Sequence, residues 1–412
     1  MHIVMITDYY LPTLGGIQTS VKAQKYALEK AGHKVTIICP GRTPSGDPTI
    51  IHVPTFRHIH PDGFPVAGPT NAVIQSITGY LQLLQPIDVV HVHSDMVCGL
   101  SGLVVAKRLN IPTVQSMHGR EDVYVQKILP LPAVTSYFLA KLHSAHISHA
   151  KAAINTHAKH ARTITARRIW RLMVSHVNYA DTAIIPSCHF AQKLTEHGMT
   201  VPHAIVSNGL EDPVLAMIGK PKLHQYTGRT PLQIIWCARF SPEKRPLQFL
   251  KAIRYIKGPV NVHFYGDGLL TRKMQRYINH HGLNSIVTIH GPVPQAKVLA
   301  AMRTADLFVS TSYDFDNQPM VFLEAIATGL PVCIVDPELG EVFPEKGYFV
   351  TATPHPRDIA QSIQTIIDAP SQIAAVSRKL LQHQEAVSQQ NQTAALVTVY
   401  KQAIRACQSA TI

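Results

Sequence analysis

The feature that most constrains the fold is an alternation of short apolar runs with helix-length segments. The chain opens with such a run at residues 2–7, followed by a helical segment at 18–30 and a β-branched run at 34–39, the order of a βαβ unit. Further apolar runs and intervening helix-length segments follow at residues 71–84, 89–93, 99–109, 113–117 and 182–186. Strands that alternate with helices predict a parallel sheet covered by helices.

The same alternation restarts in the second half of the chain. Apolar runs of strand length occur there at residues 232–237, 262–265, 286–290, 307–310 and 331–335. A polar, turn-rich stretch at 207–229 separates the halves, and 412 residues suffice for two domains with separate cores. We therefore predict an α/β protein of two doubly wound parallel-sheet domains, residues 1–200 and 201–390, with a final helix at 391–412.

Composition and cysteine placement bear on the compartment. Hydrophobic residues make up 46% of the chain and charged residues 15%, the balance of an ordered globular protein. The six cysteines are scattered, and no signal peptide precedes the first predicted strand, so we expect a reduced, cytoplasmic protein. The nearest approach to a membrane span, residues 128–142, is shorter than the roughly 20 residues required and is interrupted by Pro130 and Pro132.

The positive charge of the chain is concentrated in one segment. Net charge is +13, which favours an anionic partner: nucleic acid, acidic lipid or a phosphorylated substrate. Residues 123–180 contain no Asp or Glu but hold Lys127, Lys141, Lys151, Lys159, Arg162, Arg167, Arg168 and Arg171.

If residues 162–174 are helical, Arg167, Arg168 and Arg171 lie on one side, and Ile169, Leu172 and Met173 on another. With the apolar side chains of residues 128–139, this helix is expected to dock on an anionic membrane surface. An ordinary helix with a solvated basic face is the alternative. Nucleic acid is not the expected partner, because the segment lacks interleaved stacking aromatic residues.

Two carboxylates eight positions apart, Asp316 and Glu324, bracket the predicted start of a buried helix. Pro319 at a first helical position and an apolar run ended by Gly329 predict a helix N-terminus with free backbone N–H groups, which bind phosphate. Carboxylates nearby would accept hydrogen bonds from hydroxyl groups of the same ligand, so a nucleotide-sugar fits. The alternative is an acidic residue that favours the helix dipole alone.

This stretch resembles the acidic-x7-Glu signature of glycosyltransferase family 4, the retaining group with the GT-B fold. The resemblance implies two Rossmann-like domains facing across a cleft, with the last helix returning to the first domain. It also implies a catalytic role for Asp316 and donor contacts from Asn317, Gln318, Pro319, Met320 and Glu324. The sequence departs from the family pattern by having Asp316 where Glu is usual and by lacking a Gly two or three residues later.

A second motif supports the same resemblance. The run from Ala238 to Lys244 resembles the family's G-R-x-x-x-E-K segment, with Ala238 where Gly is usual. Two cations, Arg239 and Lys244, would stabilise the charge that grows on a departing diphosphate. An R-x4-K spacing is also common on surfaces. The turns at Gly266 and at residues 290–293 resemble the family's G-x-G turn and base-contacting loop, although each is compatible with an ordinary turn.

The first half carries weaker motifs. Gly15-Gly16 after the first strand is expected to contact the donor diphosphate, with a plain strand-to-helix turn as the alternative. His118 ends a strand where the family carries a His close to the sugar, and the following Glu121, Asp122 and Tyr124 resemble the acceptor-binding stretch of lipid-glycosylating members. His91 and His93 share a strand face, which is compatible with metal ligands but more typical of core or surface histidines.

No metal or other cofactor is expected. Asp314 and Asp316 form a D-x-D pair of the kind that holds Mg²⁺, but Arg239 and Lys244 are expected to take the place of the metal. The resemblance further implies that a departing phosphate oxygen takes the acceptor's proton, so that no dedicated general base is needed.

Three functional hypotheses remain at this stage. The first is a peripheral enzyme on the inner face of the cell membrane that transfers glucose from UDP-glucose to a lipid such as diacylglycerol. The second is a soluble family member that glycosylates a saccharide or small metabolite. The third, motivated by Asp316 in place of Glu, is a sugar-nucleotide-binding protein without turnover.

Overall fold

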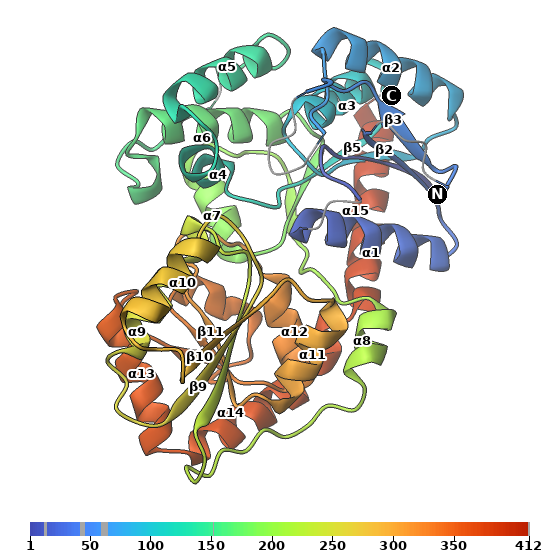
Figure 1. Ribbon diagram of the computed structural model, residues 1–412. Helices are drawn as coiled ribbons and strands as arrows, with labels where there is room; N and C mark the ends of the chain where they lie inside the picture. Colours follow the sequence, from blue (N-terminus) through green and yellow to red (C-terminus); the bar gives the residue numbers. More distant parts are fainter. Residues whose placement is uncertain (12–14, 42–45, 59–64, 151, 411–412) are drawn as a thin grey trace. The chain divides into compact units, whose positions relative to one another are not determined.

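The computed structural model describes residues 1–412 apart from 12–14, 42–45, 59–64, 151 and 411–412. The chain divides into two compact units (Figure 1). Unit 1 consists of Met1–Gly209 together with Gln389–Ile412, and unit 2 is Leu210–Ser388. The sequence-based boundaries were 200 and 390.

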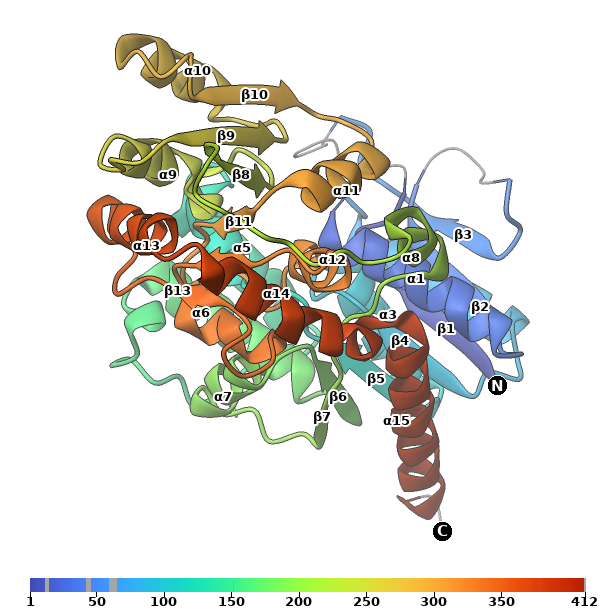
Figure 2. The ribbon, with the colours of Figure 1, turned by 90° about the horizontal axis from the view of Figure 1, so that it is seen from below.

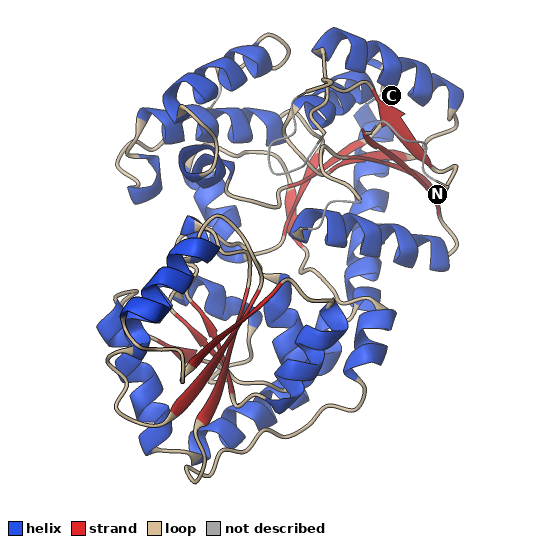
Figure 3. Cartoon of the chain, in the orientation of Figure 1, coloured by secondary structure: helices blue, strands red, loops and turns tan. Residues whose placement is uncertain are grey.

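Unit 1 contains a seven-stranded sheet in the order β3-β2-β1-β4-β5-β6-β7, in which all neighbours are parallel. Its strands are β1 (His2–Ile6), β2 (Lys34–Pro40), β3 (Ile50–Val53), β4 (Val89–Val92), β5 (Thr113–Ser116), β6 (Thr182–Ile185) and β7 (His203–Ile205). Short apolar runs buried on both faces form these strands, as is typical of parallel sheets. Helices cover both faces (Figure 3).

The helices of unit 1 follow the alternation of side chains along the strands. They are α1 (Gly16–Lys30), α2 (Thr70–Leu83), α3 (Val97–Arg108), α4 (Glu121–Lys127), α5 (Pro132–Ser144), α6 (Ile164–Val177), α7 (Cys188–Glu196) and α15 (Gln389–Ala410), with the short 3₁₀ helix η2 (Lys159–Ala161). Val4 and Ile6 of β1 pack in one cluster with α2 and α3. Ile3 and Met5, which point to the opposite face, pack with α1 and α15.

Unit 2 contains a six-stranded parallel sheet in the order β10-β9-β8-β11-β12-β13. Its strands are β8 (Leu232–Cys237), β9 (Val260–Tyr265), β10 (Val287–Gly291), β11 (Leu307–Ser310), β12 (Val332–Ile334) and β13 (Phe349–Val350). Ile234 and Trp236 of β8 face one core cluster, and Ile235 between them faces the other. Both sheets therefore confirm the predicted fold class of two doubly wound parallel-sheet domains.

Helices cover both faces of this sheet as well. Those of unit 2 are α8 (Asp212–Ile218), α9 (Pro246–Ile253), α10 (Thr271–His280), α11 (Gln295–Thr304), α12 (Met320–Thr328), α13 (Pro356–Asp368) and α14 (Ser371–Gln382), with the 3₁₀ helices η3 (Pro242–Lys244), η4 (Pro337–Val342) and η5 (Gln384–Val387). Figure 2 shows α9, α10 and α13 on one side of the strands and α11 and α12 on the other.

In each sheet the first strand along the chain lies in the interior, so the direction of winding reverses beside it. In unit 1 the reversal falls between β1 and β4, and in unit 2 between β8 and β11. The loops at the carboxyl ends of such strand pairs diverge, and ligands of open α/β sheets bind there. The residues singled out in the sequence lie at these two places, here named the β1–β4 site and the β8–β11 site.

None of the helices in the described part of the chain combines the length and apolar character that a membrane span requires.

Candidate active site

The β8–β11 site holds the two predicted cations on the loop after β8. Lys244 ends the 3₁₀ helix η3, and its carbonyl oxygen accepts a hydrogen bond of 2.8 Å from the Thr311 hydroxyl at the end of β11. That hydroxyl accepts in turn from the indole N–H of Trp236 in β8. The backbone at Lys244 is therefore fixed to both strands of the site.

Each cation has a carboxylate partner. The Nζ of Lys244 lies 2.5 Å from Oδ1 of Asp316, and both side chains are largely buried. Arg239 is half-exposed, with its guanidinium 3.8 Å from the buried carboxylate of Glu243. The structure thus brings Lys244 and Asp316 into direct contact, although they are 72 residues apart, and it keeps Arg239 on the same loop.

The second predicted carboxylate, Glu324, lies on α12. The helix begins at Met320, with Pro319 as its N-cap, one residue later than the sequence predicts, and no side chain caps its first turn. Its free N–H groups favour an anion. Glu324 is buried, and its Oε1 accepts a 2.6 Å hydrogen bond from Gln295 of α11. Burial raises the pKa of Glu324 above its ordinary value.

Gly266 packs the strand-end loops of this site together. Its φ of 131° favours glycine, and a Cβ there would lie 2.1 Å from the carbonyl oxygen of Ala238. Its N–H donates to the carbonyl oxygen of Gly291, 3.0 Å away. Backbone packing alone therefore accounts for this glycine. Its predicted donor contact remains a prediction, as do those of Asn317 and Gln318, which precede α12.

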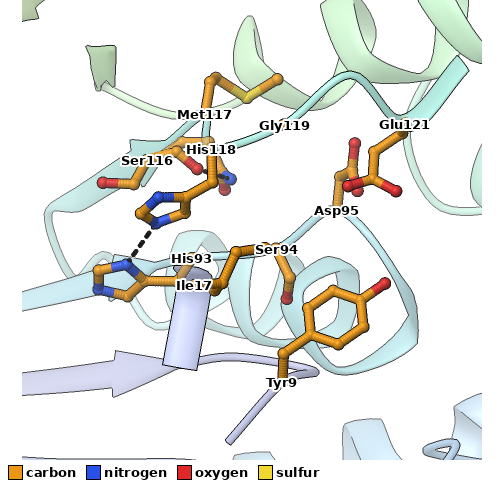
Figure 4. Close-up of a pocket in the computed structure, with 11 residues that line it drawn as sticks. Tyr9, Ile17, His93, Ser94, Asp95, Ser116, Met117, His118, Gly119 and Glu121 are labelled. Atoms are coloured by element: carbon orange, nitrogen blue, oxygen red, sulfur yellow. Dashed lines mark hydrogen bonds between the residues drawn. The ribbon is translucent and has the colours of Figure 1, made fainter. Parts of the chain in front are cut away.

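The β1–β4 site is built around His118, which follows β5. Nε2 of His118 is 3.0 Å from Nδ1 of His93, and the two rings stack (Figure 4). His91 lies beneath them, 2.7 Å from both the Ser116 hydroxyl and the Tyr400 hydroxyl of α15. Burial lowers the pKa of His118 to about 4 and that of His91 to about 3. These rings are neutral at pH 7 and act as hydrogen-bonding groups, not as cations.

His91 and His93 are core histidines held by hydrogen bonds within the fold. Among the residues that the structure describes, no group of three His, Cys, Asp or Glu side chains is placed to hold a metal.

Sequence reasoning missed several residues of the β1–β4 site. The β1–β4 site contains a pocket beside His118, and its lining residues are Tyr9, Ile17, His93, Ser94, Asp95, Gln115, Ser116, Met117, His118, Gly119 and Glu121. Figure 4 shows the carboxyl groups of Asp95 and Glu121 close to one another, near the Tyr9 ring. Neither Tyr9 nor Asp95 belongs to a recognisable local motif. The signal that the sequence offers for them is their place just after the predicted strands β1 and β4.

The three predicted acceptor residues on α4 have different surroundings. Glu121 lines the pocket, and Tyr124 is half-buried one turn further on without lining it. Asp122 is buried and forms a two-point ion pair with Arg120, at 2.7 and 2.9 Å. The Arg120 guanidinium also stacks over the ring of Trp170. Both carboxylate oxygens of Asp122 thus have a partner inside the fold, and its acceptor contact remains a prediction.

Gly15 and Gly16 lie at the start of α1. A Cβ on Gly15 would meet only the flexible side chain of Gln18, and one on Gly16 would meet nothing within 4 Å. Packing against the backbone therefore does not require glycine here. The absence of side chains leaves the uncapped start of α1 open, which fits the predicted approach of a ligand.

The basic segment forms an amphipathic surface, as its pattern predicts. On α6, Ile169, Leu172 and Met173 are buried, whereas Arg167 and Arg168 are half-exposed and Arg171 is exposed. Arg168 donates to the Ala133 carbonyl and lies over the Tyr137 ring. Beside them α5 and its N-cap expose four apolar side chains: Leu131 at 73%, Val134 at 49%, Tyr137 at 48% and Phe138 at 62%. We call these four the apolar patch. Lys151 lies outside the described residues.

Comparison with known proteins agrees with the fold. The model described as Glycosyltransferase Family 4 matches residues 14–212, and that described as Glycosyl transferases group 1 matches residues 222–386. The α-monoglucosyldiacylglycerol synthase of Acholeplasma laidlawii is 25% identical over 364 residues, which cover 84% of this chain and 83% of that protein. The enzyme of the same name from Streptococcus pneumoniae is 23% identical over 350 residues, 81% of this chain and 70% of that protein.

A solved structure shows the same architecture. The crystal structure of HepE from Anabaena in complex with UDP matches with a TM-score of 0.69 at 14% identity, covering 98% of this chain and 100% of that chain. Fold and strand-end sites together define a GT-B glycosyltransferase of two parallel-sheet domains. The chain belongs to glycosyltransferase family 4, and it is a nucleotide-sugar-dependent hexosyltransferase.

Proposed function

We propose that this enzyme transfers glucose from UDP-glucose, with retention of configuration, to a membrane lipid that carries a free hydroxyl group, such as diacylglycerol. It acts as a peripheral protein on the cytoplasmic face of the cell membrane. The relatives that make α-monoglucosyldiacylglycerol support the choice of sugar and acceptor. The UDP in the HepE crystal supports the choice of nucleotide.

The observation that carries the lipid proposal is the apolar patch beside the basic face of α6. Leu131 and Phe138 expose most of their apolar surface to water. Exposed apolar surface does not stabilise a fold, and a patch of it is typical of an interaction site. Arg168 lies over the Tyr137 ring of this patch, and Arg171 is exposed further along α6, so the surface combines apolar side chains with cations that attract anionic lipid headgroups. Each well-placed cation contributes about 1 kcal/mol of binding to such a surface.

The patch and the β1–β4 site are joined by a short length of chain. Glu121 of the pocket is the first residue of α4, and the loop after α4 reaches Leu131, the N-cap of α5. A lipid whose acyl chains lie against the membrane at the patch would present its hydroxyl group to a pocket in the same unit. This arrangement favours a lipid acceptor over a sugar taken from solution.

The chemistry follows from charges at the β8–β11 site. Arg239, Lys244 and the start of α12 stabilise the diphosphate as the bond between the anomeric carbon and the phosphate oxygen breaks. The acceptor oxygen forms its bond on the same face, and its proton passes to the departing phosphate oxygen. Glu324 accepts a hydrogen bond from a hydroxyl group of the donor. No metal takes part, and neutral His118 holds the sugar by a hydrogen bond.

Incubation with labelled UDP-glucose tests the proposal. Vesicles of diacylglycerol in phosphatidylglycerol are expected to yield a labelled glycolipid that is extracted into organic solvent. Labelled products formed only with water-soluble sugars would overturn the lipid acceptor and favour the saccharide alternative.

Vesicle sedimentation tests the apolar patch separately. The double variant Leu131→Ser/Phe138→Ser is expected to lose most binding to phosphatidylglycerol vesicles, because it removes two exposed apolar anchors. Met217→Ser, at a position 45% exposed on α8 of unit 2, serves as the matched control and should bind as the wild type does. Equal binding by the patch variant would show that membrane association does not use this surface.

A further inference from the structure

We propose that Asp95 is a substrate-binding residue of the β1–β4 site, where it acts with Glu121 as a pair of carboxyl groups that binds the hydroxyl group of a neutral acceptor. This inference rests on the proposed function, because it concerns how the acceptor of that reaction is chosen. It adds a residue that no sequence motif indicates, and it narrows the class of acceptor.

The observation that leads to Asp95 is an unsatisfied atom. Asp95 is 7% exposed and lines the pocket, yet its Oδ2 is buried and has no hydrogen-bond partner among the residues that the structure describes. A buried polar atom without a partner destabilises a fold. The requirements of folding therefore do not account for a carboxylate at this position, whereas a ligand atom in the pocket would.

A neighbouring acid shows what a structural carboxylate looks like here. Asp8 follows β1, and its Oδ1 accepts from the backbone N–H of Cys98, while Oδ2 accepts from Gly99 and from the Ser94 hydroxyl. Asp8 thereby caps the start of α3. Asp95 lies next to Ser94 in the chain and has the same burial, but it makes no such cap.

The loop that carries Asp95 is held rigidly. The Ser94 hydroxyl is fixed by Asp8, and a Cβ on Gly99 would lie only 2.0 Å from the Ser94 carbonyl oxygen, so the turn into α3 is tight. His93, which precedes Ser94, is fixed by its contact with His118. Asp95 is therefore held in the pocket between two anchored segments, as expected of a preorganised binding group.

The pair with Glu121 indicates the kind of ligand. Both carboxyl groups are near one another in the pocket (Figure 4), and burial raises the pKa of each, that of Asp95 to about 7. Two such carboxyl groups that share one proton offer one O–H donor and several acceptor oxygens. An alcohol has the complementary set. No Lys or Arg occurs among the described residues that line the pocket, so a phosphate group there would be repelled.

The main experiment compares Asp95→Asn with the wild type in the glycolipid assay. We expect the KM for diacylglycerol in mixed vesicles to rise by about tenfold to a hundredfold, as on losing a hydrogen bond to a charged group. UDP affinity measured by calorimetry should not change, because Asp95 is not among the residues proposed to contact the nucleotide. Asp95→Glu should recover part of the acceptor affinity. An unchanged KM for Asp95→Asn would overturn the inference and leave the proposed function standing.

Thermal unfolding separates binding from structure. Asp8→Asn is expected to lower the Tm, because it disrupts the cap of α3. Asp95→Asn should keep or raise the Tm, because it replaces a buried carboxyl group whose Oδ2 makes no hydrogen bond within the described part of the fold. A Tm for Asp95→Asn that falls as far as that of Asp8→Asn would assign Asp95 a structural role and refute the proposal.

A binding measurement does not depend on turnover. Saturation-transfer NMR with 1-monobutyrin, a water-soluble glyceride with free hydroxyl groups, is expected to detect contact with the wild type and much weaker contact with Asp95→Asn. Equal transfer to both proteins would reject the inference even if no glycolipid were formed. Wild-type protein that binds monobutyrin but makes no glycolipid would instead refute only the proposed function.

Discussion

The two sites of this molecule handle charge in opposite ways. At the β8–β11 site, Lys244 is paired with Asp316 and Arg239 lies near Glu243, so fixed cations are present with acids beside them. At the β1–β4 site, burial keeps His118 and His91 neutral and raises the pKa of Asp95 and Glu121. The first arrangement suits a diphosphate, and the second suits an uncharged alcohol.

The sites also differ in how closely they are joined to the core. In unit 1, His91 hydrogen-bonds to Tyr400 of α15, and Asp122 of α4 forms a buried ion pair with Arg120. Arg239 of unit 2 is half-exposed on a loop. Substitutions of Asp122 or of the hydrogen-bonded core histidines of unit 1 should therefore lower stability, whereas substitutions of the unit 2 cations should lower the rate of turnover. The predictions below test this contrast.

The largest expected effect is a loss of stability in acid that is greater in unit 1 than in unit 2, where the pKa values of His224, His263 and His290 are also lowered by burial. Burial lowers the pKa of His91 and His176 to about 3 and of His118 and His197 to about 4, from an ordinary 6.5. Above pH 6.5 both folded and unfolded forms are neutral, so the stability is complete. Below it the unfolded chain binds protons that the folded chain cannot, and each histidine lowers the free energy of unfolding by up to about 1.4 kcal/mol per pH unit.

The raised pKa values of Asp8, Asp95 and Glu121 act in the opposite direction, but the histidines with lowered pKa values outnumber these acids. Urea unfolding followed by tryptophan fluorescence can separate the units, because Trp170 lies in unit 1 and Trp236 in unit 2. The variants Trp236→Phe and Trp170→Phe isolate each signal. Equal acid sensitivity of the two signals would contradict the contrast.

Breaking the Arg120–Asp122 pair should have the next largest effect. Asp122→Ala leaves the Arg120 guanidinium buried without its partner, which is expected to lower the free energy of unfolding by about 3–5 kcal/mol. Chemical denaturation monitored by circular dichroism measures this change. Glu29→Ala, which removes a partly exposed carboxylate partner of Lys25 on α1 and leaves its second partner Asp47, is the control and should cost less than about 1 kcal/mol. Similar losses for both variants would argue against a buried role for Asp122.

Removing a cation of unit 2 should show in turnover. Lys244→Ala and Arg239→Ala are each expected to raise the activation free energy by about 2.7–4 kcal/mol, a fall in kcat of about a hundredfold to a thousandfold. Initial rates with saturating UDP-glucose and lipid vesicles measure it, and Lys273→Ala on the exposed face of α10 is the control. If both variants lost stability and kept kcat, the cations would be structural.

Substitution of His118 should have a smaller effect. His118→Ala removes one neutral hydrogen-bonding group, so kcat is expected to fall by roughly tenfold with little change in UDP affinity. Steady-state kinetics and calorimetry on the same preparation separate the two quantities. Unchanged turnover would remove His118 from the set of catalytic residues.

Chelation should have no effect. Because Arg239 and Lys244 are proposed to stabilise the diphosphate, activity after dialysis against EDTA is expected to equal that of the untreated enzyme. A loss of activity that Mg²⁺ restores would instead favour a metal at the Asp314–Asp316 loop.

The sequence predicts the interior strands well and the edge strands poorly. Residues 232–237 and 307–310 are apolar runs in the middle of their sheet and were placed with correct ends. β3, β7 and β13 were not predicted, because each is a short edge strand whose side chains are partly exposed.

The candidate site shows the same division. Arg239, Lys244 and Asp316 belong to local motifs, so the sequence indicates them although only the fold brings Lys244 onto Asp316. Asp95 and Tyr9 belong to no motif, and only the order of strands in the sheet places them with Glu121. The sequence does not separate Asp122 from Glu121, but consecutive residues of a helix point about 100° apart, so Asp122 is buried against Arg120 while Glu121 lines the pocket.

The return of α15 to unit 1 affects how the protein is made. Leu396, Val399 and Tyr400 complete the cluster that contains Ile3 and Met5 of the first strand, and the Tyr400 hydroxyl holds His91 beneath the pocket. A ribosome therefore releases the whole of Leu210–Ser388, a continuous unit able to form its own core, before the partners that close the earlier unit have emerged. The surroundings of His91 in the β1–β4 site can therefore be completed only after Leu210–Ser388 has been synthesised.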